Sequence, residues 1–177
     1  MENKTVVPPI PRYAIGNQVR YFRVNLFTEV HFQLKGSFFK RPIFDTSRNS
    51  IVNGIIFGCP FDAGCSYRVG ARFGPQGVRQ ASQLMQYSYH PWHKAEIKDK
   101  KVFDAGDVPC TPYNIKNALN SIYEYAAELR KYTDNVICVG GDHTISYSLL
   151  KAASEKIGKP VSLLHFDTHL DTGQDSL

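Results

Sequence analysis

The chain has 177 residues, of which 42% are hydrophobic and 21% charged, so it is long enough and apolar enough to build one globular domain. That composition excludes a chain that is disordered over most of its length. The formal net charge is +5, but Lys and Arg are scattered and form no basic aromatic stripe, so we expect solvated surface charge and no nucleic-acid partner.

The first fifty residues have no clear period. Pro8, Pro9 and Pro11 favour an extended start, and the aromatic-rich stretch 30–39 shows neither helical spacing nor strict alternation. We interpret residues 1–50 as an arm or cap that lies on the domain.

Nothing near Met1 resembles an export signal, and no apolar run approaches the length of a membrane-spanning helix. The four cysteines form no C-x-x-C pair, so a zinc knuckle is not indicated. We therefore expect a cytoplasmic protein with no membrane partner and with reduced thiols.

From residue 51 onward, apolar runs alternate with helical patterns. Four short apolar runs predict buried strands at 51–57, 101–104, 136–139 and 161–166. Helix signals predict helices at 75–85, from about 111 to 129, and from about 144 to 157. This alternation predicts a parallel sheet covered by helices, in which sites form where the strands end.

Metal-ligand residue types follow the last two predicted strands. Gly-Gly-Asp-His occupies positions 140–143, and Asp-Thr-His-Leu-Asp occupies positions 167–171. In an extended segment, alternate side chains share one face, so Asp167, His169 and Asp171 would project together beside His143. Mixed imidazole and carboxylate ligands suit Mn, Fe, Ni or Zn better than Ca or Mg. The sequence predicts a metal site made of His143, Asp167, His169 and Asp171.

A purely structural interpretation of these segments competes with the metal site. Asp142 would then cap the helix that follows, with a hydrogen-bonded histidine beside it. The two segments together, at neighbouring strand ends, favour the metal site. His165 lies deeper in its predicted strand, and we interpret it as a core histidine with satisfied hydrogen bonds. Surface or packing roles are the default for the other three histidines, His31, His90 and His93.

These segments resemble the ureohydrolase family of arginases, agmatinases and related enzymes. The resemblance runs from about Ile51 to Asp171 and is carried by five segments in the family's order. They are Pro-Phe-Asp at 60–62, Gly-Ala-Arg-Phe-Gly-Pro at 70–75 followed by Arg79, Asp-Ala-Gly-Asp at 104–107, and the two metal motifs at 140–143 and 167–171. The forms at 60–62 and 70–75 are more similar to agmatinases than to arginases. The resemblance implies a three-layer α/β/α fold with a parallel sheet, of which residues 51–172 form the amino-terminal part.

The resemblance also implies a dinuclear centre, usually of manganese, with Ni, Fe or Zn as alternatives. His143 would bind one ion and His169 the other, Asp167 would bridge them, and Asp171 would join His143. Such a centre hydrolyses a small guanidino compound and releases urea, and members of the family are usually homo-oligomers. The sequence leaves the substrate open among agmatine, guanidinobutyrate, guanidine and others.

Two departures from the family pattern bear on activity. The family's second carboxylate motif, D-x-D, and its proton-transfer histidine are expected beyond Leu177, so no catalytic residue is assigned here. Residues 173–177 also differ from the family and form an atypical tail. We expect a chain that is incomplete and inactive by itself. The alternatives are a non-catalytic truncated product and a zinc deacetylase of related fold, although Asp171 fits the ureohydrolase pattern better.

Overall fold

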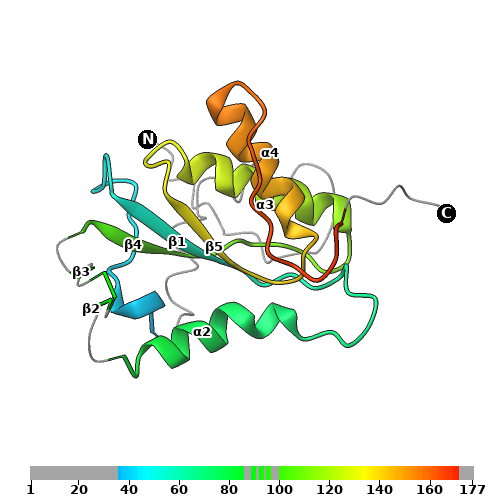
Figure 1. Ribbon diagram of the computed structural model, residues 1–177, viewed down its shortest axis with the longest axis horizontal. Helices are drawn as coiled ribbons and strands as arrows, with labels where there is room; N and C mark the ends of the chain where they lie inside the picture. Colours follow the sequence, from blue (N-terminus) through cyan, green and yellow to red (C-terminus); the bar gives the residue numbers. More distant parts are fainter. Residues whose placement is uncertain (1–35, 86–88, 91, 94, 97–99, 172–177) are drawn as a thin grey trace, which may run out of the picture.

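A parallel sheet forms the centre of the computed structural model, which describes residues 36–85, 89–90, 92–93, 95–96 and 100–171. Within these residues the strand order is β4 (Val102–Asp107), β1 (Gly54–Cys59), β5 (Val136–Gly140), and both pairings are parallel (Figure 1). A separate antiparallel pair joins β2 (Tyr89–His90) to β3 (Ala95–Glu96). The predicted strands near 51, 101 and 136 are thereby confirmed.

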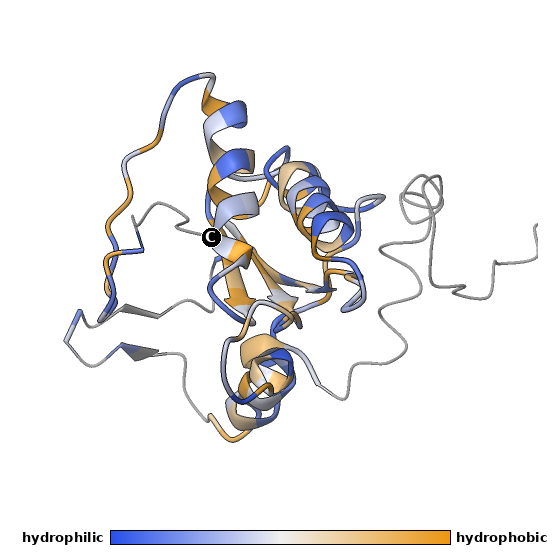
Figure 2. Ribbon diagram, turned by 90° about the vertical axis from the view of Figure 1, so that its right-hand side faces the viewer, coloured by the Kyte–Doolittle hydropathy of each residue, from blue (hydrophilic) through white to orange (hydrophobic). Residues whose placement is uncertain are grey.

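Helices cover both faces of the sheet. The helix α2 (Gly74–Ser82) lies on one face, and α3 (Ile115–Leu129) and α4 (Ile145–Ile157) lie on the other (Figures 1 and 2). The described residues also form two short 3-10 helices, η2 (Phe38–Lys40) and η3 (Ala71–Phe73). The expected three-layer α/β/α arrangement is confirmed. Because helices cover both faces, β1 is buried along its whole length, which explains its continuous apolar sequence.

The ends of the two long helices follow local capping chemistry. The side chain of Asn114 accepts the backbone N–H of Asn117 at 2.9 Å, so α3 begins at Ile115 and not at the predicted Thr111. The end of α4 is as predicted, because Gly158 adopts a left-handed conformation with φ of 73°.

The predicted strand at 161–166 is wrong. After α4 the chain continues as an irregular extended segment (red in Figure 1) that pairs with no described strand. Leu163, Leu164 and Phe166 are 60%, 80% and 88% exposed. A parallel strand that is apolar on both faces needs helices over both of them. No described element supplies that cover, so the local apolar pattern is not sufficient to form a strand.

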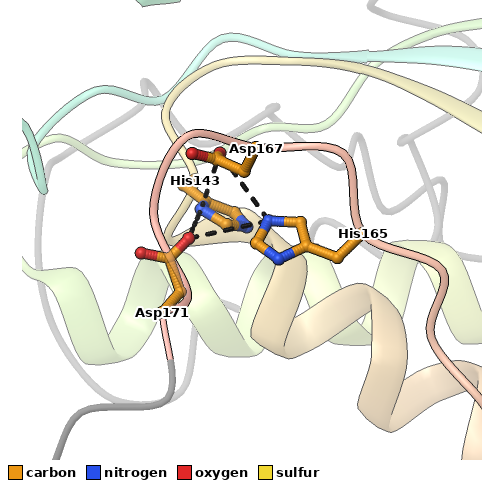
Figure 3. Close-up of side chains that lie close together, drawn as sticks. All are labelled: His143, His165, Asp167 and Asp171. Carbon is orange, nitrogen blue, oxygen red and sulfur yellow. Dashed lines mark ion pairs between the residues drawn. The ribbon is translucent and has the colours of Figure 1, made fainter.

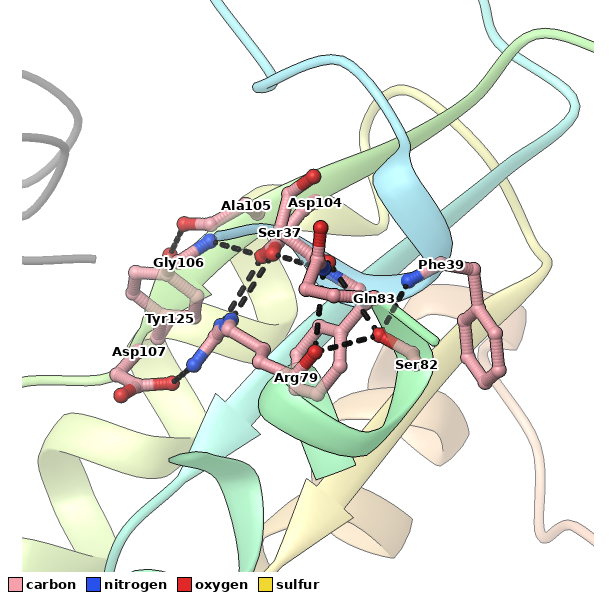
Figure 4. A network of polar contacts seen from close by, with 11 residues as sticks. Ser37, Phe39, Arg79, Ser82, Gln83, Asp104, Ala105, Gly106, Asp107 and Tyr125 are labelled. Carbon is pink, nitrogen blue, oxygen red and sulfur yellow. Dashed lines mark hydrogen bonds and ion pairs between the residues drawn. The ribbon is translucent and has the colours of Figure 1, made fainter. Parts of the chain in front are cut away.

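A buried ion pair joins α2 to the sheet (Figure 4). The guanidinium of Arg79 donates to both carboxylate oxygens of Asp104, from Nε at 2.9 Å and from Nη2 at 3.0 Å, and to Asp107 at 2.5 Å. Both Arg79 and Asp104 are almost completely buried. Asp104 also accepts the backbone N–H of Phe38 at 2.8 Å, and the guanidinium lies 3.9 Å from the centre of the Phe38 ring. One arginine therefore holds α2, β4 and η2 together.

The described part of the predicted amino-terminal arm, residues 36–50, packs on the domain. The backbone of Pro42 and Phe44 bonds to Asp104, and the side chain of Phe44 is buried. Residues 1–35 and 172–177 lie outside the described residues. The four cysteines are free thiols. Among the described helices, none has the length and apolar character needed to span a membrane.

We predict that Arg79→Met lowers the free energy of unfolding by about 3–5 kcal/mol, because it leaves the buried carboxylate of Asp104 and the partly buried one of Asp107 without their cation. Urea denaturation followed by circular dichroism measures the change. Arg48→Met is the matched control, because Arg48 pairs with Asp45 on the exposed surface, where a pair contributes at most about 1 kcal/mol. Equal stability of the two variants would contradict this role of Arg79.

Candidate metal centre

The carboxyl ends of the three parallel strands meet at one edge of the sheet. Cys59 at the end of β1 lies opposite Gly140 at the end of β5, and Gly58 lies opposite Asp107 at the end of β4. The turn that carries His143 leaves the sheet at this edge. The candidate site therefore forms where parallel α/β sheets usually carry their ligands.

The turn at 140–143 requires glycine at position 141. Gly141 has a φ of 67°, and a Cβ added to it would lie 2.5 Å from the carbonyl oxygens of both Cys59 and Phe61. The next residue, Asp142, donates its backbone N–H to Phe61 at 2.8 Å. The backbone that precedes His143 is thus pressed against the end of β1.

Asp142 belongs to the support of the site and not to the group of metal-ligand atoms. Its carboxylate accepts the backbone N–H of Thr144 at 3.0 Å, just before α4 begins, and that of Gly64 at 2.7 Å. Asp142 therefore forms a turn just before α4 and does not cap it, because the N-cap residue is Thr144, whose side chain makes no capping bond. The second bond also ties the loop that follows β1 to the turn that carries His143.

That loop is closed by a second carboxylate, Asp62. Its side chain is buried and accepts Nε of Arg72 at 2.6 Å together with the backbone N–H groups of Gly70 and Arg72. The hydrogen bond from the Arg72 side chain lowers the pKa of Asp62 to about 2, and the backbone donors act in the same direction. The two motifs at 60–62 and 70–75 are therefore joined through one ionised carboxylate.

Four donor atoms converge beside this support, within 4.8 Å of one another (Figure 3). Nδ1 of His143 lies 2.7 Å from Oδ2 of Asp171 and 3.8 Å from Oδ2 of Asp167. Nε2 of His165 lies 3.6 Å from each of these two oxygens. The structure thus brings together three of the four residues that the sequence singled out, and it adds His165.

His169 lies outside this group. Its backbone N–H donates to Oδ1 of Asp167 at 2.9 Å, and the chain bends at Thr168 and His169. This bond lowers the pKa of Asp167. The bend breaks the alternation on which the sequence prediction relied, so the His169 side chain is 76% exposed, with Nδ1 3.3 Å from Oδ1 of Asp167.

His165 corrects the interpretation of a satisfied core histidine. Its Nε2 is buried, yet it forms no hydrogen bond within the described residues, and it faces the two aspartates. A buried nitrogen acceptor or donor without a hydrogen bond is costly. Positions 165 and 167 lie two residues apart and share one face of an extended segment. This spacing was the signal in the sequence that indicated a place for His165 beside Asp167.

The donor set fits a divalent transition metal. Two imidazole nitrogens and two carboxylate oxygens converge, and an ion between them would satisfy the buried nitrogen of His165 and offset the charge of the paired aspartates. On the far side of Asp167, the described residues offer only Oδ1 and His169. The site as described therefore fits one ion well and a second ion poorly.

Comparison with known proteins places this geometry in a family. Residues 52–177 match the model of the arginase family. The chain belongs to the arginase family. It is 40% identical over 125 residues to the agmatinase of Chromobacterium violaceum, covering 70% of this chain and 39% of that protein.

Two further relatives agree with this placement. A hypothetical agmatinase from Burkholderia thailandensis superposes with a TM-score of 0.70 at 36% identity, over 79% of this chain and 44% of that one. The proclavaminate amidinohydrolase of Streptomyces clavuligerus is 34% identical over 67% of this chain and 37% of its own length. The chain thus spans about two fifths of the length of the curated relatives that it matches.

We predict that Gly141→Ala is strongly destabilising. The left-handed conformation alone costs a residue with a Cβ about 1–2 kcal/mol, and the contacts with Cys59 and Phe61 add to this. Gly77→Ala is the control, because nothing lies within 4 Å of a Cβ there and alanine gains about 0.5–1 kcal/mol within a helix. Thermal melts of both variants test the prediction, which fails if Gly141→Ala melts as the native chain does.

A second prediction concerns acid stability. Because the pKa of Asp62 falls from 3.8 to about 2 in the folded chain, its stabilising contribution is complete above pH 4 and disappears as the pH drops through about 2. Asp62→Asn should therefore lower stability at neutral pH and show a weaker loss between pH 4 and 2. Denaturant midpoints across this range measure the effect, and parallel curves for the two proteins would contradict it.

Proposed function

We propose that this protein is a metal-dependent hydrolase of a guanidino compound, agmatinase-like, which releases urea, and that the 177-residue chain alone does not complete the reaction. The observation that carries the proposal is the convergence of His143, Asp167 and Asp171 at the strand ends of an arginase-family fold. The 40% identity to an agmatinase supports a guanidino substrate. Manganese, as the resemblance implies, is the proposed metal of the complete site.

The chemistry of the substrate explains why such a site is needed. The central carbon of a guanidinium is a poor electrophile, because three nitrogens share the positive charge with it. When bound, divalent ions supply a water of lowered pKa that can attack such a carbon near neutral pH. The residues of this chain hold and orient the donors for those ions.

The protein positions the two halves of the donor set differently. The backbone contacts of Gly141 and Asp142 hold His143 against the end of β1. Asp167 and Asp171 lie on the segment that follows α4, where an N–H donor from His169 orients the carboxylate of Asp167. The two oxygens of Asp167 face different histidines, Oδ2 toward His143 and Oδ1 toward His169. This carboxylate is the residue best placed to serve two ions.

Counting ligands explains the proposed inactivity of the chain alone. The side of Asp167 that faces His143 has three further donors, whereas the side that faces His169 has only the imidazole of His169 among the described residues. A second ion held by so few protein ligands binds weakly, because charged ligands determine affinity at such sites.

We predict that the purified chain, loaded with Mn²⁺, releases no urea from agmatine, guanidinobutyrate or guanidine. A colorimetric urea assay measures this, with the agmatinase of Chromobacterium violaceum as the positive control. His143→Ala is the matched variant of this chain. Urea release that His143→Ala abolishes would show that the chain is a working enzyme and would overturn the proposed inactivity.

A further inference from the structure

We propose that this chain binds one zinc-like divalent ion through His143, His165, Asp167 and Asp171, and that His169 is not a ligand of that ion. The proposal rests on the proposed function, because it takes from it that these residues form a metal site. It differs from the dinuclear arrangement that the family resemblance implies, both in the number of ions and in the histidine used.

The geometry of the four donors suits a single tetrahedral ion. Zinc binds nitrogen and oxygen ligands at about 2.0–2.2 Å, which places neighbouring ligand atoms of a tetrahedron about 3.3–3.6 Å apart. The distances from the two imidazole nitrogens to the two Oδ2 atoms range from 2.7 to 3.8 Å, and all four donor atoms lie within 4.8 Å of one another. Figure 3 shows the four side chains pointing toward one another, and small side-chain shifts would bring the four atoms to one centre.

The position of His165 is the observation that selects it over His169. Its Nε2 is buried, makes no hydrogen bond within the described residues, and faces Oδ2 of both aspartates. His169 instead lies beside Oδ1 of Asp167, on the outer side of that carboxylate, and its imidazole is mostly exposed. The two histidines therefore face opposite oxygens of Asp167, and only one of them shares the side of His143 and Asp171.

The type of donor sets the preferred ion. Two imidazoles and two carboxylates form a four-donor site of mixed nitrogen and oxygen, which Zn²⁺ accepts readily. Affinity for such sites rises from Mn²⁺ towards Cu²⁺ and stays high for Zn²⁺. The chain should accordingly bind Zn²⁺ and its spectroscopic substitute Co²⁺ more tightly than Mn²⁺.

Titration of the 177-residue chain with Zn²⁺, by calorimetry and by competition with a chromophoric chelator, tests the proposal. We expect one ion per chain. His165→Asn should weaken binding by at least about tenfold, since even outer-shell partners of a metal ligand contribute 10–100-fold. His169→Asn, the matched control four residues away, should leave the affinity unchanged.

A second measurement, in which a substitution adds an absorption band, tests the proposal even if His165→Asn perturbs the fold. With Co²⁺ in place of Zn²⁺, the native chain should show the intense visible absorption of a four-coordinate ion. His165→Cys should add a thiolate-to-cobalt charge-transfer band to the spectrum of the native chain, whereas His169→Cys should add none. Two ions per chain, no bound ion, or a dependence on His169 in place of His165 would each overturn the proposal. None of these readouts requires urea release, so the urea assay judges the proposed function separately.

Discussion

The ion pair between Arg79 and Asp104 is the interaction on which the arrangement of the layers depends. A buried pair of this kind often adds little net stability over an apolar contact, but it imposes one geometry, because either charge alone would be costly to bury. Arg79 thereby fixes α2 against β4, and Asp104 also holds the backbone of Phe38. The effect extends to the site, since the start of α2 lies so close to Gly140 that a Cβ on Gly74 would be 2.7 Å from its carbonyl oxygen.

The two halves of the metal centre are held with very different strength. The turn before His143 is enclosed by the end of β1, by the loop that Asp142 anchors at Gly64, and by the first turn of α2. The segment from His165 to Asp171 has no ladder partner within the described residues, and its internal contacts include the hydrogen bond from the backbone of His169 to Asp167. The fold therefore preorganises His143. The position of the donors between His165 and Asp171 depends on the turn within that segment and on an ion that binds all of the donors.

The contrast between these halves explains how much could be predicted from the sequence. The strand β1 was predictable because burial on both faces leaves a continuous apolar run, and shorter apolar runs indicated β4 and β5. The end of β5 then located His143. The segment at 161–166 is also a short apolar run. Whether such a run pairs as a strand depends on neighbouring strands and helices, which the local sequence pattern does not reveal. The buried contact of Arg79 with Asp104 spans 25 residues and was likewise beyond any local pattern.

The exclusion of His169 follows from the bend that comes directly after the predicted strand. In a fully extended strand, positions 165, 167, 169 and 171 would share one face, with His165 deepest and His169 between the two aspartates. The bend at Thr168 and His169 removes His169 from that row and brings Asp171 to within 3.6 Å of His165, measured from Oδ2 to Nε2. Extending the segment would separate Asp171 from His165 and place His169 between Asp167 and Asp171. The choice of histidine is therefore coupled to the conformation of this segment, and so is the number of ions for which donors are available.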